Sequence, residues 1–270
     1  MKILRIKIYQ PQAHYRIPFT VQRRHTYPIP PYSTVIGLLI NLLGLKDQSD
    51  SLFVDGIKNL KISIAGWFEI KTIEKIWFRN LSKESHKDRF GLVNNRIFGG
   101  HIEHFGGQSP MTIDILNDVH LIIYIFHKDE IILETIKEKI LNPIDRLEVL
   151  HLGRAEDWIV FEDLPQLIDV SELAYKRIDT NYEIFFWIPE RIFQINDELI
   201  DYNQFQGLIY NLPVFFEIEN YQTTFNKNGK RKFSYIRAKL NDGKIYKTNI
   251  LLDLNSGFPK PMPIFLGDLQ

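Results

Sequence analysis

Apolar and polar residues alternate near the start of the chain, and this alternation predicts a β-strand over residues 2–10. One side of the strand is apolar and would face a core, while the opposite side carries Arg5, Lys7 and Tyr9. A basic sheet face with an aromatic ring is typical of proteins that bind RNA. The solvated outer face of an antiparallel sheet has the same pattern, so the alternation predicts the strand but leaves the role of its polar face open.

A long apolar run follows a proline-rich segment and predicts a buried helix from Val35 to Leu45. The prolines at positions 28, 30 and 31 hold the preceding segment extended. The run is apolar on nearly every side, which is typical of a helix inside a core, and it is too short to span a bilayer. Gly37 would admit a neighbouring backbone, and Gly44 would end the helix in a left-handed conformation.

The start of this helix predicts an anion site. Ser33 or Thr34 would cap the unpaired N–H groups of the first turn. Arg23, Arg24 and His25 lie just ahead of the positive end of the helix. A helix N-terminus beside arginines is a natural place for a phosphate group.

Later apolar runs predict the other elements of the first half of the chain. The runs lie at residues 60–68 and 70–78 (two strands bent near Gly66, or one long hairpin), 118–127 (a strand), 129–141 (a helix capped by Asp129 and ended by Pro143) and 147–152 (a closing strand). The resulting order is βαββαβ, which is the ferredoxin-like or RRM plan.

Residues 79–110 have no sustained periodicity, but basic residues, histidines and phenylalanines are interleaved there between two pairs of glycines. We expect an inserted arm whose cations meet phosphates while rings stack on bases. A plain surface loop is the alternative. The candidate RNA-binding residues of this arm are Arg79, Arg89, Phe90, Arg96, Phe98, His101 and His104.

The sequence pattern changes near residue 165. After it, short segments rich in aromatic residues, which predict β-strands, alternate with residues typical of turns. Asn228-Gly229 and Asp242-Gly243 each predict a β-hairpin. We therefore expect two parts: an α+β domain over residues 1–165, with the arm inserted at about 79–110, and an antiparallel β-rich subdomain over residues 166–270. The first of the two hairpins is basic, as charged hairpin tips often are for solubility; its cations are Lys227, Lys230, Arg231, Lys232, Arg237 and Lys239.

Composition narrows the class of protein. Hydrophobic residues make up 44% of the 270 positions and charged residues 24%, which is ordinary for a globular chain, and there is no cysteine. Disulfides and thiolate metal sites are excluded, and a reducing cytoplasm is expected. No apolar run has the length of a membrane span, so we expect no membrane partner. The net charge is zero, yet residues 1–46 contain seven basic residues and no acidic one, which indicates a local anionic partner.

Three motifs in this order resemble one protein family. They are Tyr-Pro-x-Pro-Pro-x-Ser-Thr-Val-x-Gly-Leu-Leu from Tyr27 onward, Pro-x-Thr-x-x-x-Leu-x-Asp-Val from Pro110 onward, and Leu-Gly-Arg-x-Glu from Leu152 onward. The set resembles the Cas-five family of CRISPR-associated RAMP proteins, and it is most similar to the members found in subtype I-B. Together the motifs cover most of the first 160 residues.

The resemblance implies a modified ferredoxin-like fold with an inserted thumb, followed by a second β-rich part. Members of the family bind the repeat-derived 5′ handle of the CRISPR RNA at the foot of the Cascade complex, and they contact its backbone subunit and its large subunit. The resemblance therefore implies a non-catalytic RNA-binding subunit in antiviral defence. It implies no cofactor, no metal and no small-molecule substrate.

Carried over to this chain, the resemblance makes residues 79–110 the thumb. It also assigns handle-binding roles to a basic group ahead of the helix and to one arginine after the domain core; these residues are Arg16, Arg23, Arg24, His25, Tyr27 and Arg154. For Arg154 there is an alternative, an internal salt bridge with Glu156 or Asp157.

Two other functions remain open from the sequence. In subtype I-C the corresponding protein is a metal-independent endoribonuclease, and Tyr27, His86, Lys87, His101 and His104 could supply such chemistry here. A further alternative is an RNA-binding RAMP protein of another branch, or a subunit whose basic arm meets only acidic proteins. The His-x-x-His pair at 101 and 104 has no third ligand in sight, so a metal site is not expected.

Overall fold

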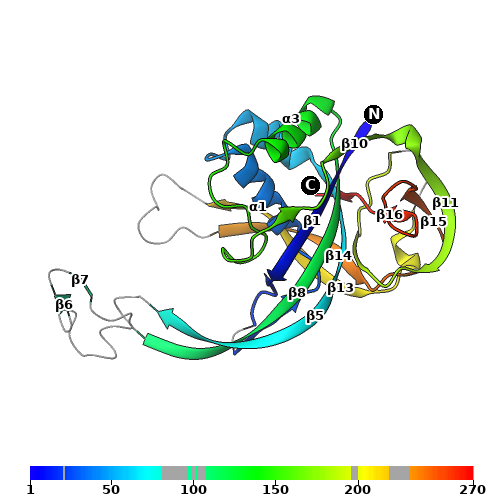
Figure 1. Ribbon diagram of the computed structural model, residues 1–270. Helices are drawn as coiled ribbons and strands as arrows, with labels where there is room; N and C mark the ends of the chain where they lie inside the picture. Colours follow the sequence, from blue (N-terminus) through cyan, green and yellow to red (C-terminus); the bar gives the residue numbers. More distant parts are fainter. Residues whose placement is uncertain are drawn as a thin grey trace.

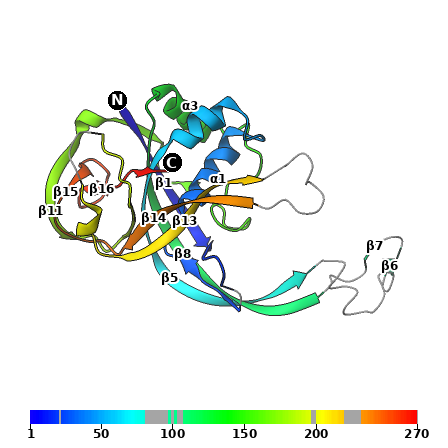
Figure 2. The ribbon, with the colours of Figure 1, turned by 180° about the vertical axis from the view of Figure 1, so that it is seen from behind.

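The computed structural model describes residues 1–20, 22–80, 97–98, 101–102, 107–195, 200–218 and 231–269. It is a mixed α/β structure built around a curled, mainly antiparallel sheet (Figure 1). Two helices lie on one side of this sheet, and a smaller sheet lies on the other (Figure 2). Within the described ranges, no helix has the length and apolar character needed to cross a membrane.

The large sheet has the strand order β10-β1-β8-β5-β12-β14-β13, with the short strands β3, β9 and β17 attached to its members. Its main strands are β1 (Lys2–Ala13), β5 (Lys61–Asn80), β8 (Gly107–Phe126), β10 (Gln166–Asp169), β12 (Phe185–Pro189), β13 (Leu208–Ile218) and β14 (Arg231–Asn241). The short ones are β3 (Arg23–Arg24), β9 (Val160–Phe161) and β17 (Gly267–Asp268). The strand predicted over residues 2–10 is confirmed as the first ten residues or so of β1, and it continues to Ala13.

Helix α1 (Tyr32–Leu43) confirms the predicted buried helix, because seven of its side chains are buried against the sheet. The prediction of its start is wrong. Pro31 is the N-cap residue and no side chain caps the helix, so neither Ser33 nor Thr34 has that role. Proline at this position is compatible with the helix because its missing N–H would be unpaired in any case.

Two glycines of α1 differ in their surroundings. Gly44 ends the helix in the left-handed conformation, as predicted, with φ +69°. Gly37 does not admit a neighbouring backbone, because nothing lies within 4 Å of the position where a Cβ would be.

Because of these surroundings, we expect alanine at the two positions to change the free energy of unfolding in opposite directions. A Cβ on Gly44 would lie 2.5 Å from the Asp145 carbonyl oxygen in a backbone conformation that L side chains rarely adopt. We expect Gly44→Ala to lower the free energy of unfolding by about 2 kcal/mol. Gly37→Ala should raise it by about 1 kcal/mol, because alanine is the better helix former at this exposed position. Urea denaturation of both variants checks the pair, and a loss of stability in Gly37→Ala would contradict it.

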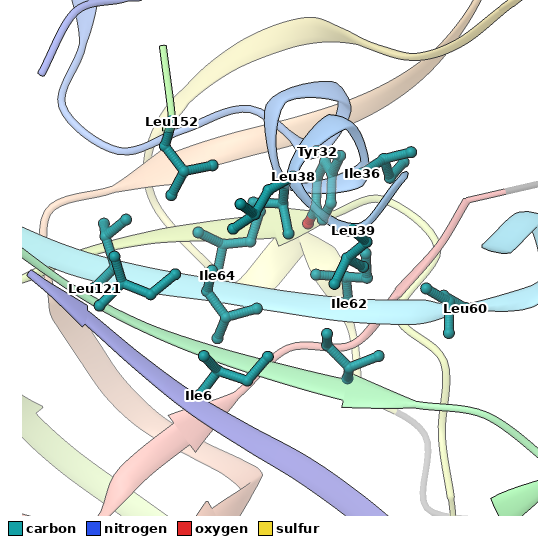
Figure 3. Close-up of a cluster of buried hydrophobic side chains, with 14 of the residues drawn as sticks. Ile6, Tyr32, Ile36, Leu38, Leu39, Leu60, Ile62, Ile64, Leu121 and Leu152 are labelled. Atoms are coloured by element: carbon teal, nitrogen blue, oxygen red, sulfur yellow. The ribbon is translucent and has the colours of Figure 1, made fainter. Parts of the chain in front are cut away.

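The main core lies between the helices and one face of the large sheet. Leucine and isoleucine side chains of α1 pack on Ile6, Ile62 and Ile64 (Figure 3). Helix α3 (Glu130–Leu141) adds three more buried side chains, and its N-cap Asp129 accepts from the Ile131 N–H at 3.0 Å, as predicted. The core fixes α1 relative to β1, β5 and β8.

Strands β5 and β8 pair along their whole length and extend together beyond the helices (Figures 1 and 2). The expectation of two strands over 60–68 and 70–78 is wrong, since residues 61–80 form one strand. Gly66 does not break this strand; a Cβ there would lie 2.5 Å from the His120 carbonyl oxygen, so glycine permits the two strands to pair closely. The strand is continuous because β8 supplies a partner for every segment of it.

Strand β10 pairs antiparallel with the start of β1. The prediction of a strand at residues 147–152 is wrong: within that segment only His151 forms an isolated β-bridge, with Trp158. The strands of the region after residue 165 join both sheets, since β12, β14 and β13 extend the large sheet while the small sheet has the order β11-β15-β16. Its strands are β11 (Leu173–Asn181), β15 (Lys244–Asp253) and β16 (Met262–Ile264).

The expected hairpin at Asp242-Gly243 is wrong. Strands β14 and β15 follow one another, but β14 pairs with β12 and β13 and β15 pairs with β11 and β16. Gly243, with φ +92°, turns the chain from one sheet to the other. The turn at Asn228-Gly229 lies outside the described residues, and the antiparallel partner of β14 on that side is β13.

The polar face of β1 is partly covered by the small sheet and its loops. Arg5 is 7% exposed and forms an ion pair at 2.5 Å with the buried Asp253. Lys7 forms an ion pair at 2.7 Å with Asp163. Both sequence interpretations of this face are therefore wrong near Arg5, where the face is neither open to RNA nor solvated, because a second layer packs on it.

Candidate nucleic-acid interface

A cavity of about 540 Å³ opens at the N-terminus of α1. It is bounded by the arm that precedes the helix, by the far part of the paired strands β5 and β8, and by the turn after residue 152. Its lining includes His14, Tyr15, Arg16, Pro18, Arg24, Tyr27, Pro31, Ser33, Thr34, Ile76, Ile113, Gly153, Arg154, Glu156 and Pro213. We refer to it below as the N-terminal pocket. Segments that are far apart in the sequence thus meet at one helix end.

The arm that precedes α1 is held in place by pairing and by one buried tryptophan. Strands β2 (Tyr15–Arg16) and β4 (Thr26–Tyr27) pair antiparallel, so the chain between them forms a loop. Trp187, which is fully buried, donates its Nε1–H to the Pro30 carbonyl at 2.9 Å. The prolines keep this part extended, and the tryptophan fixes its position against the sheet. Arg16 and Arg24 are thereby placed beside the helix N-terminus.

The charges of the N-terminal pocket favour an anion. Its lining contains Arg16, Arg24 and Arg154 against the single carboxylate Glu156. The first turn of α1, which the structure describes in full, has no acidic side chain and no side-chain cap. Its unpaired N–H groups and the helix dipole add further positive charge. Burial lowers the pKa of the Arg24 guanidinium, and the positive charge of Arg16 lowers it further. The two arginines repel each other, and a phosphate between them would remove that repulsion.

Arg154 is part of an internal ion pair. Its Nη2 lies 2.6 Å from Oδ1 of Asp157, which is 1% exposed, and its Nη1 lies 3.3 Å from Glu156. The same Asp157 carboxylate accepts the backbone N–H groups of His14 at 2.9 Å and Arg154 at 2.8 Å. The salt-bridge alternative for Arg154 is confirmed. The guanidinium still lines the pocket, so its role in binding RNA stays a prediction.

Arg23 and His25 share one buried carboxylate, Asp114 of β8. Arg23 Nε donates to Asp114 Oδ1 at 2.7 Å, His25 Nδ1 lies 3.1 Å from Oδ2, and Lys71 Nζ lies 3.9 Å away. Burial alone favours the neutral acid, but the hydrogen bonds from Arg23 and His25 outweigh it and hold the pKa of Asp114 below its usual value. The contacts of Arg23 and His25 with Asp114 therefore tie the arm to the β5–β8 hairpin.

The lowered pKa of Asp114 predicts a pH dependence of stability. A carboxylate whose pKa is lowered by folding stabilises the folded state above its unfolded pKa of about 3.9, and that contribution disappears as the pH falls through the lower folded value. We expect Asp114→Asn to lower the free energy of unfolding by about 2 kcal/mol at neutral pH. The difference from the wild type should shrink below about pH 4. Urea denaturation across this range checks it, with Asp179→Asn, an exposed aspartate of β11, as the control; a difference that does not change with pH would contradict the pairing.

Two aromatic or imidazole side chains of the pocket are buried. Tyr27 is 3% exposed, and its ring packs edge-on against Trp187 and Tyr210 at centroid distances of 5.5 and 5.3 Å. Burial raises the pKa of Tyr27 to about 12. His14 is 4% exposed, and its Nδ1 lies 2.8 Å from the Asp114 carbonyl oxygen. Burial lowers the pKa of His14, which favours its neutral form.

The sequence-derived site residues fall into three groups. Arg16, Arg24, Tyr27 and Arg154 come together in the N-terminal pocket. Arg23 and His25 lie beside it on Asp114. The candidates of the arm are not placed as side chains. His86, Lys87, Arg89, Phe90, Arg96 and His104 lie outside the described residues. Arg79, Phe98 and His101 lie at positions of β5, β6 (Ile97–Phe98) and β7 (His101–Ile102) where only the backbone is described.

Sequence reasoning did not identify the two buried carboxylates that organise this site. Asp114 occurs in a strand pattern where a single charged residue among Ile113, Ile115 and Leu116 is a signal of a paired buried group. Asp157 was considered only as a partner of Arg154. Each carboxylate connects segments more than 80 positions apart, which no local pattern reveals.

Comparison with known proteins places the chain among CRISPR-associated proteins. A family model described as "CRISPR-associated protein (Cas_Cas5)" matches residues 3–245. No curated protein sequence matches significantly.

Among solved structures, a chain of a "CRISPR RNA-guided surveillance complex" has a TM-score of 0.54 at 13% identity, with 91% of each chain covered. This likeness shows a shared fold. A "Crystal structure of Cas protein" (TM-score 0.41, 13% identity, 91% of this chain and 98% of that one) and a CRISPR protein from Archaeoglobus fulgidus (TM-score 0.39, 11% identity, 93% and 91%) are more distant.

Proposed function

Because this chain belongs to the Cas5 family of CRISPR-associated proteins, we propose that it is a non-catalytic RNA-binding subunit of a type I surveillance complex of the I-B kind. In this proposal the repeat-derived 5′ handle of the CRISPR RNA lies in the N-terminal pocket. The observation that carries it is the position of Arg16 and Arg24 in the lining of a pocket at a helix N-terminus that has no side-chain cap. Two mutually repelling cations at the positive end of a helix are stabilised when a phosphate binds between them.

The pocket suits a single strand of RNA better than a duplex or a small metabolite. Its cavity is about 540 Å³, which accommodates one or two nucleotides rather than a helix. Phosphate contacts would come from Arg16, Arg24 and the first turn of α1, and these contacts supply affinity. The neutral His14 and the hydroxyl groups of Ser33 and Thr34 line the same wall and can hydrogen-bond to a base or a ribose.

The proposal includes a ferredoxin-like core with a thumb. The order β10-β1-β8-β5, with α1 between β1 and β5 and α3 between β8 and β10, supports the ferredoxin-like plan. The extension of β5 and β8 beyond the helices supports an arm at about residues 79–110. The division at residues 165 and 166 into a core and a β-rich subdomain stays a prediction.

The proposed partners are the CRISPR RNA and the backbone and large subunits of a cytoplasmic complex. They follow from the family and from the resemblance of the motifs at Tyr27, Pro110 and Leu152 to subtype I-B members. The exposed apolar side chains of the β5–β8 extension, Ile73 at 54% and Trp77 at 67%, support a protein or RNA contact there.

The non-catalytic assignment is supported by the state of one proposed nuclease residue. Tyr27 is enclosed by two aromatic rings and its pKa is raised to about 12. A phenol with this pKa is almost entirely protonated at neutral pH, so it is a poor general base. Of the other candidates for that chemistry, the experiment below tests His86, His101 and His104 by substitution, and Lys87 stays a candidate.

The proposed function is tested with the purified protein and its own labelled repeat RNA in EDTA, analysed on native and denaturing gels. We expect a mobility shift with intact RNA, and weakening of the shift as salt rises because phosphate contacts release counterions. A discrete cut upstream of the handle that His→Ala changes at 86, 101 or 104 abolish would contradict the proposal and make the protein a processing nuclease. Absence of a shift at low salt would also contradict it.

A further inference from the structure

Three exposed aromatic rings form a row on strands β13 and β14. They are Phe216, Phe233 and Tyr235, which are 37%, 42% and 59% exposed, and we refer to them as the aromatic ladder. The ring centroids of Phe216 and Phe233 lie 6.1 Å apart, and those of Phe233 and Tyr235 lie 6.3 Å apart. Phe216 and Phe233 face each other across the two strands. Exposed rings in a regular row are rare on a surface that binds nothing.

The surroundings of the aromatic ladder are polar and basic. Arg237 lies on the same face of β14 as Phe233 and Tyr235, opposite the exposed Asn211. Arg237 forms an ion pair at 3.2 Å with Glu190, but both side chains are about half exposed, so a phosphate can compete for the guanidinium. Strands β13 and β14 together contain four basic residues and one acidic residue.

The ladder is continuous with the N-terminal pocket. Pro213 lines the pocket and pairs in register with Tyr235. Strand β13 also packs against the arm that precedes α1, because the ring of Tyr210 contacts the ring of Tyr27. A flexible chain that leaves the pocket past Pro213 therefore meets Tyr235 next.

We propose that the aromatic ladder is a second nucleic-acid surface, on which bases of a single strand stack while Arg237 contacts its phosphates. Aromatic rings accept any base because each base has a π-face, and cations beside the rings hold the backbone. The inference rests on the proposed function for the class of ligand, and it extends the path of that ligand from the pocket onto β13 and β14.

A protein partner fits this surface less well. Basic residues outnumber acidic ones four to one along β13 and β14, and this excess favours an anionic partner. Aliphatic side chains of the same strands, Leu208 and Ile209, are exposed at the far end of β13, away from Phe216. Three neighbouring rings with Arg237 on the same face are the arrangement typical of single-strand binding.

The test measures fluorescence anisotropy of a labelled oligothymidine of about 16 nucleotides with the full-length protein at low salt. We expect Tyr235→Ala to weaken binding about tenfold, and Phe233→Ala to have a similar effect, because each removes one stacked base. Tyr246→Ala is the matched control, since Tyr246 is a tyrosine of β15 that is 50% exposed and lies outside the ladder. Thermal melting of each variant establishes that it is folded.

The same measurement on Arg16→Ala/Arg24→Ala separates the two proposals. If the double variant binds oligothymidine more weakly while Tyr235→Ala and Phe233→Ala bind it as the wild type does, the result contradicts the ladder proposal and supports the pocket. If the ladder variants weaken binding while the double variant does not, the handle site fails and the ladder stands. Failure of the wild type to bind oligothymidine overturns the ladder, as does a loss of assembly with the other subunits at unchanged oligonucleotide affinity, since the occupant would then be a protein.

Discussion

Arg16→Ala/Arg24→Ala is expected to weaken binding of the repeat RNA about 100-fold. Each arginine would lose a charge-assisted contact to phosphate worth about 1.4 kcal/mol, which is a factor of ten. The slope of log affinity against log salt should fall by about 1 for each cation removed. The variant should fold normally, because removing both arginines relieves the repulsion between them.

The matched control for this prediction is a second pair of surface arginines. Arg146 and Arg177 are exposed and lie away from the N-terminal pocket. Titration of labelled repeat RNA at several salt concentrations compares the two double variants. An Arg146→Ala/Arg177→Ala variant that loses as much affinity as Arg16→Ala/Arg24→Ala would show that binding depends only on total charge, and the pocket would lose its support.

Asp157→Ala should be among the most destabilising substitutions in the chain, at about 3 kcal/mol or roughly 6–12 °C in melting temperature. The carboxylate is 1% exposed and accepts from Arg154 and from the backbone N–H groups of His14 and Arg154. Its removal leaves these donors without an acceptor in a site that excludes water. The turn after Leu152, which closes one side of the pocket, should loosen at the same time.

Glu156→Ala provides the comparison, because Glu156 contacts the same arginine but is 66% exposed at a distance of 3.3 Å. An exposed ion pair contributes about 0–1 kcal/mol, so this variant should melt close to the wild type. Differential scanning calorimetry measures the loss of stability in each of the two variants. Equal losses of stability would mean that burial of Asp157 is not the source of its effect.

Local patterns in the sequence predict those elements whose stability is decided locally. The prolines before α1, the apolar run from Val35 and the left-handed end at Gly44 each constrain a few consecutive residues, and the structure confirms the helix they predict. The cap at Asp129 is of the same kind. The predicted start at Ser33 or Thr34 failed because Pro31 already fixes an extended backbone conformation at the N-cap.

The errors occur where distant segments compete for the same strand. Asp242-Gly243 has the residues of a hairpin turn, yet β14 finds partners in β12 and β13, and β15 finds them in β11 and β16. The polar face of β1 has the pattern of an RNA-binding sheet face. In the structure, however, Arg5 of this face pairs with Asp253, which lies 248 positions away in the sequence. No pattern within one strand specifies which other strand will cover it.

In the candidate site, too, local features are predictable from the sequence and pairings between distant segments are not. The sequence identified the cations of the pocket, because arginines beside a helix N-terminus form a local signal. It did not identify their positions in the fold: Arg23 is paired with Asp114, a residue 91 positions away, while Arg16 and Arg24 line the cavity. The carboxylates decide which cations can meet a phosphate, and their placement depends on the whole fold.

Binding of the 5′ handle in the N-terminal pocket is tested most directly by photo-cross-linking. The wild-type protein is cross-linked to its repeat-derived 5′ handle carrying 4-thiouridine, and the cross-linked peptides are identified by mass spectrometry. We predict cross-links in the segments that line the N-terminal pocket, at residues 14–27 and 153–156, and their loss in Arg16→Ala/Arg24→Ala. Cross-links confined to the small sheet of β11, β15 and β16 would contradict the account, because that sheet lies on the opposite side of the large sheet from α1.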